Sequence, residues 1–344
     1  MEKEKLYGRT LNELIGITRK LGMPGFSAMQ IADWLYRKKI SELGEMTNLS
    51  LKMREKLSSD YQLGLVSPLS FRQSTDGTKK YLFKVQEDKS VETAYIPEED
   101  RATVCMSVQV GCRMGCIFCA TGMQGFHGNL TSNEILNQFR SLPEFDNLTN
   151  MVFMGMGEPL DNLPELLKSL DIMTSSWGYG WSPTRITVST VGLITGMKKF
   201  LENTRCHLAV SLHSPFDEER KQLMPIQKTN SVQEVLQIIR GFDFNSQRRI
   251  SFEYILFDNL NDSPRHVREL ARILNGIRCR INLIRYHTVP GSSIKSPDMN
   301  SVFAFRDALR AKGIITTIRS SRGVDIQAAC GLLSTLEHIK NKSQ

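Results

Sequence analysis

Hydrophobic positions recur at helical spacing in residues 1–60. Thr10 and Glu13 fit the capping box that opens a helix, and Pro24 lies where this helix has to end. Ser27 stands where a cap would begin a second helix with its own apolar face. The pattern therefore predicts a small helical domain over residues 1–60.

The pattern changes to short strand-like runs in residues 61–100. Residues 80–85 and 91–96 are apolar or alternate with polar positions, which is typical of strands, and Asp76 with Gly77 is a turn signal. We expect a β-hairpin here that links the helical domain to the rest of the chain.

From residue 101 onward, apolar runs alternate with helical patterns. Thr131 and Ser231 begin two further capping boxes, and Gly313 closes a helix. The strand candidates are residues 103–110, 151–154, 185–189, 207–212, 250–256, 279–284 and 314–318. Buried strands that alternate with helices predict a parallel sheet, and about six or seven of them suit an open α/β barrel over residues 101–320. The functional groups of such a barrel gather at the carboxyl ends of its strands.

The composition allows a large core and a polyanionic partner. The chain has 344 residues, 40% of them hydrophobic, and 44 Lys plus Arg against 36 Asp plus Glu give a net charge of +8. This balance permits nucleic-acid binding without requiring it. The chain opens with charged residues rather than a secretory segment, and no apolar run is long enough to cross a bilayer. We expect a cytoplasmic protein, without a membrane partner, whose seven cysteines are reduced.

Three of the cysteines, Cys112, Cys116 and Cys119, lie close together in GCRMGCIFCATG. Structural zinc takes four protein ligands in a closed shell, and the nearest further thiol, Cys105, falls within a predicted strand. An iron–sulfur cube also binds thiolates, and three of them leave one iron with an open coordination position. The spacing favours the iron–sulfur cluster, and a zinc ion held by these thiolates and a distant His is the alternative.

The C-x3-C-x2-C spacing after a strand of an α/β barrel resembles the radical S-adenosylmethionine superfamily. The resemblance implies one [4Fe-4S] cluster on Cys112, Cys116 and Cys119, whose open iron chelates the amino and carboxylate groups of S-adenosylmethionine. It also implies reductive cleavage of the sulfonium to a 5′-deoxyadenosyl radical, with Phe118 near the adenine. Taken by itself, Phe118 fits a buried core position equally well.

Residues 154–159, MGMGEP, follow the next strand and resemble the Gly-Gly-Glu element of that superfamily. Gly157 lets the backbone approach a ligand, and the resemblance implies that Glu158 binds the methionine ammonium group. The other cofactor contacts lie at strand ends, and they are Ser189, Ser211, Leu212, His213 and His287. Taken singly, the polar ones among them also fit turn caps or satisfied core groups.

The resemblance becomes narrower over longer motifs. VQVGCRMGCIFCATGMQGF, FMGMGEPLDN, RITVSTVG, AVSLHSP, INLIRYHTVPG and RSSRGVDIQAACG occur in the order found in the bacterial 23S rRNA adenine C2 methyltransferases, which also methylate tRNA. This similarity spans nearly the whole chain. It implies a partial (βα)6 radical S-adenosylmethionine barrel with the helical domain as an RNA-binding accessory and a β-hairpin extension. The implied targets are an adenosine in the peptidyl transferase centre of 23S rRNA and the adenosine 3′ to the anticodon in some tRNAs.

The family's scheme assigns chemistry to two more cysteines and a glutamate. Cys330, in the C-terminal segment 321–344, is implied to accept a methyl group from one S-adenosylmethionine, and a second is consumed to form the radical that removes hydrogen from this methyl group. The methylene radical adds to C2 and leaves a protein–RNA crosslink. Glu92 then accepts the C2 proton, and Cys105 attacks the Cys330 sulfur to form a disulfide.

Each turnover then needs both thiols and the cluster to be reduced again, which implies a reducing system such as flavodoxin or ferredoxin. Taken by themselves, Cys105 and Cys330 fit small buried residues, and Glu92 fits an exposed strand position. One residue departs from the family pattern, because His287 stands where many members carry Asn. Either side chain donates or accepts a hydrogen bond. Cys206 and Cys279 match no motif and are interpreted as structural.

Basic residues supply candidate phosphate contacts, because the target adenosine has to leave its stack for chemistry at C2. The candidates are Arg37, Lys38 and Lys39 in the helical domain, Arg265, Arg268 and Arg272 on one helical face, Arg248 with Arg249, and Arg319 with Arg322. A solvated face is the alternative for the first group, and salt bridges to Glu269 and its neighbours are the alternative for the second.

Two other functions stay open at this point. Methylation of C8 of the same adenosine uses the same cysteines. A non-catalytic RNA-binding protein with a structural metal is the other, and it leaves Cys105, Cys330 and the MGMGEP strand end without a role.

Overall fold

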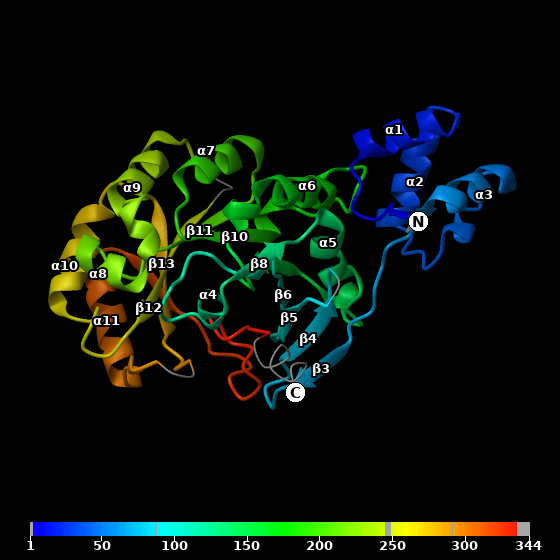
Figure 1. The fold of residues 1–344 in the computed structure, drawn as a ribbon. Helices are drawn as coiled ribbons and strands as arrows, with labels where there is room; N and C mark the ends of the chain where they lie inside the picture. Colours follow the sequence, from blue (N-terminus) through cyan, green and yellow to red (C-terminus); the bar gives the residue numbers. More distant parts are fainter. Residues whose placement is uncertain (1–2, 87, 245–248, 290–291, 336–344) are drawn as a thin grey trace.

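A computed structural model describes residues 3–86, 88–244, 249–289 and 292–335 (Figure 1). Its central feature is a set of strands that pair in parallel. They are β6 (Ala102–Cys105), β9 (Asn150–Phe153), β10 (Ile186–Thr190), β11 (His207–Ser211), β12 (Ile250–Leu256), β13 (Cys279–Arg285) and β14 (Ile315–Ile318), hydrogen-bonded in that order.

Helices connect these strands and cover their outer side, which makes the predicted partial (βα)6 barrel (Figure 1). They are α5 (Ser132–Arg140), α6 (Leu163–Thr174), α7 (Ile194–Asn203), α8 (Asp217–Leu223), α9 (Val232–Gly241), α10 (Pro264–Ile273) and α11 (Met299–Ala311). The capping boxes predicted at Thr131 and Ser231 are both present. The barrel stays open, because β14 is an edge of the sheet and antiparallel strands follow β6 on the other side.

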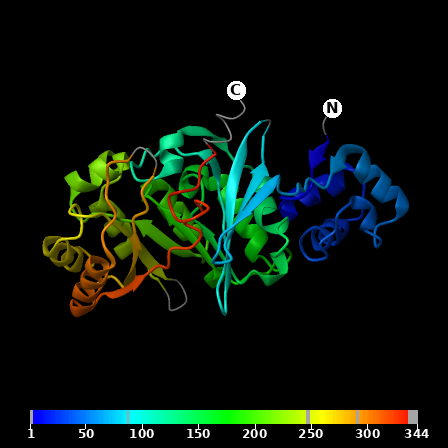
Figure 2. The ribbon, with the colours of Figure 1, turned by 90° about the horizontal axis from the view of Figure 1, so that it is seen from below.

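The predicted hairpin is part of this same sheet and has a third strand. β3 (Ser70–Gln73), β4 (Lys79–Lys84) and β5 (Ser90–Pro97) pair antiparallel, and β5 continues the sheet by pairing with β6. The turn at Asp76 and Gly77 joins β3 to β4. Figure 2 shows these strands standing between the barrel and the N-terminal helices, with the C-terminal segment alongside them.

The single strand predicted over residues 103–110 is interrupted in the structure. β6 ends at Cys105, and β7 (Gln109–Gly111) pairs with β8 (Phe126–Asn129) in a separate small sheet. The Gln138 side chain, on α5, accepts a hydrogen bond from the Ser107 N–H and donates one to the Ser107 carbonyl, both at 2.8 Å. A side-chain amide thus takes the place of a strand partner, and the chain leaves the main sheet there.

The N-terminal unit contains α1 (Leu11–Lys20), α2 (Ser27–Tyr36) and α3 (Leu51–Asp60). The capping box of Thr10 and Glu13 is confirmed, but the predicted cap at Ser27 is wrong, since Ser27 is already helical and its buried Oγ has no hydrogen-bond partner. The unit packs against the barrel through Tyr7, whose hydroxyl lies 2.6 Å from that of Tyr179.

Two of the basic residues proposed to bind phosphate instead hold this unit to the barrel. Arg37 donates to the Gly178 carbonyl at 3.3 Å, and Lys39 pairs with Asp146. Lys38, just beyond the end of α2, pairs with Asp33 of that helix and lies over the Trp34 ring. These three residues are exposed, as a solvated face would be, but each side chain also has a protein partner.

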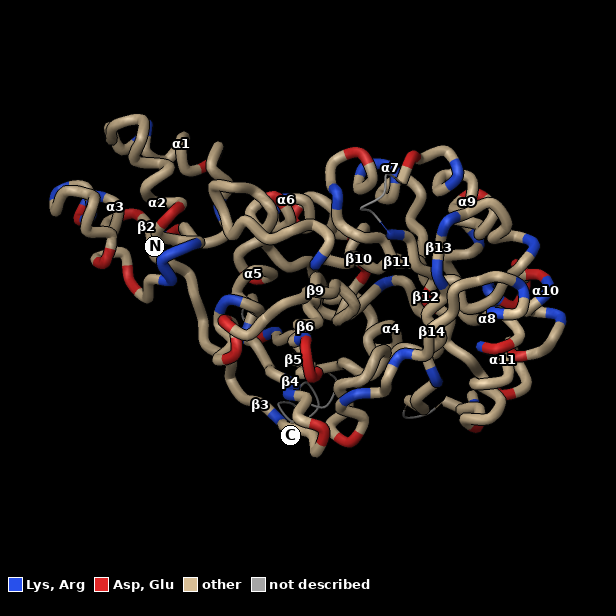
Figure 3. The backbone as a smooth tube through the Cα atoms, turned by 180° about the vertical axis from the view of Figure 1, so that it is seen from behind, with Lys and Arg blue, Asp and Glu red and all other residues tan. Residues whose placement is uncertain are grey.

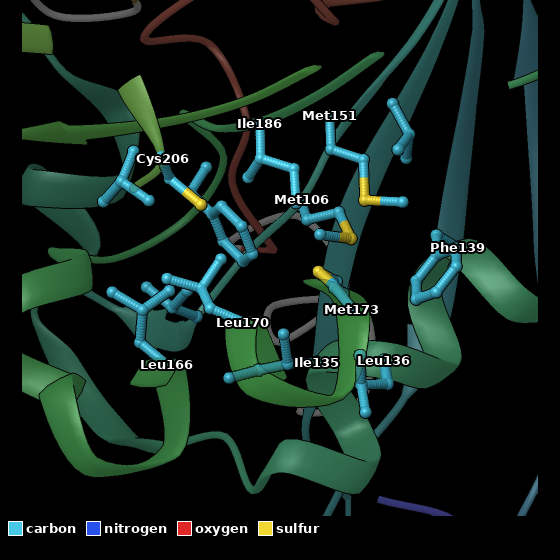
Figure 4. Packing of buried hydrophobic residues seen from close by; sticks show 14 of the residues in the cluster. Met106, Ile135, Leu136, Phe139, Met151, Leu166, Leu170, Met173, Ile186 and Cys206 are labelled. Carbon is cyan, nitrogen blue, oxygen red and sulfur yellow. The ribbon is translucent and has the colours of Figure 1, made fainter. Parts of the chain in front are cut away.

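The hydrophobic core lies between the sheet and its covering helices. Figure 4 shows Leu166, Leu170 and Met173 of α6 facing Met151 of β9 and Ile186 of β10, all fully buried or nearly so. Cys206 is 1% exposed and belongs to this same cluster, which supports its interpretation as structural. No helix in the described ranges is long and apolar enough to span a bilayer.

Candidate active site

The three clustered cysteines line a single cavity at the carboxyl ends of the parallel strands, called here the upper cavity. It encloses about 820 Å³ of empty space, counting its open mouth. Cys112 and Cys116 are buried and Cys119 is half-buried, in the loop between β7 and α4 (Ala120–Gln124). Gly111 begins this loop with a φ of +71°, and a Cβ there would collide with the Gly125 carbonyl, so the loop requires glycine.

The arrangement of the thiols fits a polynuclear cluster better than one ion. Among the described residues, no three His, Cys, Asp or Glu side chains come close enough together to bind a single metal ion. The three thiols instead share the wall of a cavity much larger than an ion. Burial raises the pKa of Cys112 to about 12 and raises that of Cys116 as well, so a bound cationic group is needed to hold them as thiolates.

Glu158 lies across the upper cavity, held by three hydrogen bonds. Its carboxylate accepts from the Thr190 hydroxyl at 2.7 Å and from the N–H groups of Leu160 and Val191 at 3.0 Å. Burial nevertheless raises the pKa of Glu158 to about 7. Gly157, which precedes Glu158, has a backbone φ of +96°. A Cβ added at Gly157 would lie only 2.5 Å from the Cβ of Gln109.

The predicted strand-end residues Ser189, Ser211 and His213 line the upper cavity as well. His213 has an unusual φ of +58°, and its Nδ1 accepts a hydrogen bond from the Ile255 N–H at 3.0 Å. Burial lowers the pKa of His213 to about 3, so the ring is neutral and carries its proton on Nε2. The Phe118 ring meets the His213 ring edge-on at 4.8 Å between centroids, which places Phe118 in this site rather than in the general core.

Two of the residues predicted to contact the cofactor do not line the upper cavity with their side chains. Leu212 is 1% exposed and packs in the core, because it follows Ser211 on the strand and therefore faces the opposite side. His287 lines two neighbouring cavities instead, and its Nε2 lies 2.7 Å from the Ser321 hydroxyl. The chain beyond β13 carries it away from the upper cavity.

Arg220 is a site residue that the sequence did not indicate. It is 1% exposed and donates to the carbonyls of Val191 at 2.7 Å, Ser211 at 3.1 Å and Leu212 at 3.2 Å. Burial lowers its pKa to about 10, so it stays charged at neutral pH, and it fixes the ends of β10 and β11. Its motif, DEERKQL, is typical of an exposed helix and gives no signal of this role.

A second cavity, the barrel lumen, adjoins the upper cavity and encloses about 1760 Å³ with its mouth. Cys105 and Cys330 both line it, and Cys330 lines the upper cavity too. Arg319 lies at the junction, where its Nη1 is 3.4 Å from Glu253 Oε2 and 3.0 Å from the sulfur of Met154. Burial raises the pKa of Cys105 to about 12, and the nearby Arg319 opposes this effect.

The C-terminal segment holds Cys330 at this junction by contacts to the turn between β3 and β4 and to α4. Asp325 accepts from the Ser74 hydroxyl at 2.6 Å, and Asp76 accepts from the Gly323 N–H at 2.8 Å. The Thr121 hydroxyl donates to the Leu333 carbonyl at 2.6 Å. Figure 2 shows this segment beside the antiparallel strands.

Glu92 is buried on β5, which differs from the exposed position that strand propensity favours. It pairs with Lys80 at 2.9 Å and accepts from the Ser334 N–H at 2.9 Å. It shares a face of β5 with Ala94, which pairs with Cys105. Glu92 lines a third hollow, between β4 and the C-terminal segment, and not the upper cavity or the lumen.

The arginines on the outer face of α10 have mostly protein partners. Arg272 pairs with Glu269 at 2.6 Å, and Arg265 lies over the Phe216 ring at 3.8 Å. Arg268 is exposed. Arg248 lies outside the described residues.

Two family models match separate parts of the chain. The Radical SAM superfamily model matches residues 106–271, and the model of the ribosomal RNA large subunit methyltransferase N-terminal domain matches residues 5–63. The chain is 55% identical to the probable dual-specificity RNA methyltransferase RlmN of Bacteroides fragilis over 335 residues, 97% of each protein. It belongs to the RlmN family of radical SAM enzymes.

Two more distant relatives are similar to this chain over nearly its full length. The dual-specificity RNA methyltransferase RlmN of Desulfotalea psychrophila is 40% identical, covering 98% of this chain and 97% of that one. The crystal structure of a radical SAM methyltransferase from Sphaerobacter thermophilus superposes with a TM-score of 0.89 at 38% identity, covering 96% and 99%. Membership of the radical SAM superfamily implies a [4Fe-4S] cluster and S-adenosylmethionine, which the upper cavity fits.

Proposed function

We propose that the chain methylates C2 of an adenosine in 23S rRNA and in tRNA, through a methyl group carried on Cys330 and a transient protein–RNA crosslink. The observation that supports this most is the position of Cys330 at the junction of two cavities, one with the three thiols and Glu158, the other with Cys105. The names of the RlmN relatives, which are RNA methyltransferases, support the substrate class.

Each part of the chain has its own role in this proposal. In this proposal residues 1–60 grip folded RNA, residues 61–100 link them to the barrel, residues 101–320 hold the cofactors and residues 321–344 carry the methyl-accepting cysteine. The protein would work in the cytoplasm, where RNA and a reducing system such as flavodoxin or ferredoxin are present.

The upper cavity is proposed to hold the cofactors. Cys112, Cys116 and Cys119 would ligate one [4Fe-4S] cluster, and Glu158, with Gly157 beside it, would bind the ammonium group of S-adenosylmethionine. When bound, the cluster supplies the electron for cleavage of one of the two S-adenosylmethionine molecules consumed per methylation. Ser189, Ser211 and His213 offer hydrogen bonds to the same ligand, and His213 does so as a neutral donor from Nε2. Leu212 and His287 are proposed to contact the same ligand, Leu212 through its backbone.

Three side chains are proposed to perform the steps on the protein. Cys330 accepts the methyl group, and Cys105 later attacks the Cys330 sulfur, so that the C–S bond to the RNA breaks and a disulfide forms. Glu92 accepts the C2 proton in this proposal, and Lys80 pairs with its carboxylate at 2.9 Å. The charge of Arg319 lies next to both thiols and opposes the burial that raises the pKa of Cys105.

Analysis of nucleosides from a deletion strain tests this function. We expect rRNA and tRNA from that strain to lack 2-methyladenosine, and a plasmid copy of the native gene to restore it. A Cys330→Ala copy should restore nothing, whereas Cys279→Ala, a half-buried cysteine outside both cavities, should restore it fully. Restoration of 8-methyladenosine instead would show the other regiochemistry, and an unchanged nucleoside profile in the deletion strain would refute the proposal.

A further inference from the structure

The lumen of this barrel is polar and open. Parallel α/β barrels normally fill this space with layers of bulky branched side chains. Here small polar side chains face inward from six of the parallel strands, and these are Thr103, Asn150, Thr187, Ser251, Asn282 and Thr317. A cavity with such a lining is suited to a polar guest with many hydrogen-bonding groups rather than to an apolar one.

The lumen reaches solvent at the end opposite the cofactors. Residues at the carboxyl ends of the strands and in the C-terminal segment, among them Cys330 and Arg319, form its upper part, and other lining residues lie at the amino ends of the strands. His207 begins β11, Arg249 directly precedes β12, and Arg280 is near the start of β13. Arg249 is exposed and Arg280 half-buried, so this end is accessible. These three residues are called here the amino-terminal rim.

The charge of the lumen suits an anion. Five arginines line it against two glutamates, and each of the two glutamates is already paired with one of these arginines. Within the described ranges, no hydrogen bond or ion pair engages the guanidinium groups of Arg249 and Arg280. Deeper in, the Nε of Arg322 is buried and has no hydrogen-bond partner, which is costly unless a guest completes it. Figure 3 shows basic positions beside β11 and β13.

We propose that the target nucleotide enters through the amino-terminal rim, that Arg249 and Arg280 bind the phosphates flanking it, and that its flipped base passes along the lumen to Cys330. The inference rests on the proposed function and adds the route. When a nucleotide flips out, its base enters the cavity first and its phosphates stay outside with the RNA backbone. The arginines of the rim suit the phosphates, and the hydroxyl and amide groups of the lumen suit the base. The two substrates then approach Cys330 from opposite ends of the barrel.

Charge-removing variants of the rim test the route. The cofactor-loaded enzyme, prepared anaerobically, is mixed with a fluorescent RNA stem-loop that presents one unpaired adenosine, and both binding and methylation are measured across a range of salt. We expect the double variant Arg249→Gln, Arg280→Gln to raise the dissociation constant and the KM for RNA about tenfold or more, and to reduce the salt slope by about one per arginine. Affinity for S-adenosylmethionine should stay unchanged, and Arg280→Lys should retain most of the RNA affinity.

Lys198→Gln is the matched control, because it removes the same charge from an exposed position on α7, on the outside of the barrel. It should leave RNA binding close to native. Equal weakening by Lys198→Gln and by the rim variants would show that the loss reflects overall charge and not the rim, and the route would be wrong.

A steric variant separates the route from general electrostatics. Thr187→Phe places a ring inside the lumen, and we expect RNA methylation to fall at least tenfold while S-adenosylmethionine still binds. Native rates with Thr187→Phe and with the rim variants would overturn the route but leave the proposed function standing. Native enzyme that binds S-adenosylmethionine but never methylates any RNA would instead refute the proposed function.

Discussion

The upper cavity and the barrel lumen share Cys330 but have different walls. Thiols and apolar side chains, among them Phe118 and Ile255, surround the upper cavity, whereas arginines, hydroxyls and amides surround the lumen. Burial in the weakly polar upper cavity penalises the charged form of a side chain. It therefore raises the pKa of Glu158 and lowers the pKa of His213. One barrel thus offers two environments, one proposed for a cluster and a sulfonium and one proposed for a nucleotide, and Cys330 lines both of them.

Removing a thiol of the upper cavity should have the largest effect on activity. This effect should be confined to the cluster and should spare RNA binding. For Cys112→Ala we expect loss of bound iron after anaerobic reconstitution and no detectable RNA methylation, because two thiolates do not retain the cluster. Iron content and the visible absorption spectrum are the measurements. RNA affinity should stay near native, since the lumen keeps its arginines. Full iron content in Cys112→Ala would contradict the ligand assignment.

Removing the thiol that faces only the lumen should stop the reaction at a different stage. Cys105→Ala should accumulate protein covalently joined to RNA, because Cys330 can form the crosslink but has no thiol to resolve it. The adduct is detected by gel shift under denaturing conditions and should be absent with Cys330→Ala. Release of free product at the native rate by Cys105→Ala would remove Cys105 from the mechanism.

Neutralising the carboxylate of the upper cavity should weaken cofactor binding and spare RNA binding. Glu158→Gln loses a charge-assisted hydrogen bond to the ammonium group, worth roughly 1.5–3 kcal/mol, so we expect affinity for S-adenosylmethionine to fall about tenfold to a hundredfold. Calorimetric titration of the cluster-loaded protein measures this change. An unchanged dissociation constant would mean that Glu158 only anchors Thr190 and Val191.

The smallest effect concerns stability and pH. The pKa of His213 is about 3 in the fold against an ordinary value of 6.5, so the unfolded chain takes up a proton first as pH falls. The contribution of His213 to stability is complete above about pH 6.5 and declines toward pH 3, by about 3 kcal/mol at pH 4. Urea unfolding at a series of pH values should show that the free energy of unfolding of His213→Gln falls less steeply with decreasing pH than that of the native protein. Identical pH profiles for the two proteins would contradict the burial of this ring.

Local signals predicted much of the framework. The capping boxes at Thr10, Thr131 and Ser231 are satisfied by residues three positions away, so sequence alone reveals them. The break after Cys105 was missed, because the group that ends the pairing is the side chain of Gln138, more than 30 residues later. Ser27 was misassigned as a cap because the preceding residue, Phe26, already has helical dihedral angles.

The candidate site also has features that follow from local sequence and features that depend on distant segments. The spacing of Cys112, Cys116 and Cys119, and glycines such as Gly157, are properties of one short loop or strand end, so the sequence by itself determined them. The burial of Arg220, the meeting of Cys105 with Cys330 and the exclusion of Leu212 and His287 from the upper cavity depend on how distant segments pack. Contacts such as Thr121 to Leu333 close loops of more than 200 residues, and only the folded barrel decides which side chains such loops bring together.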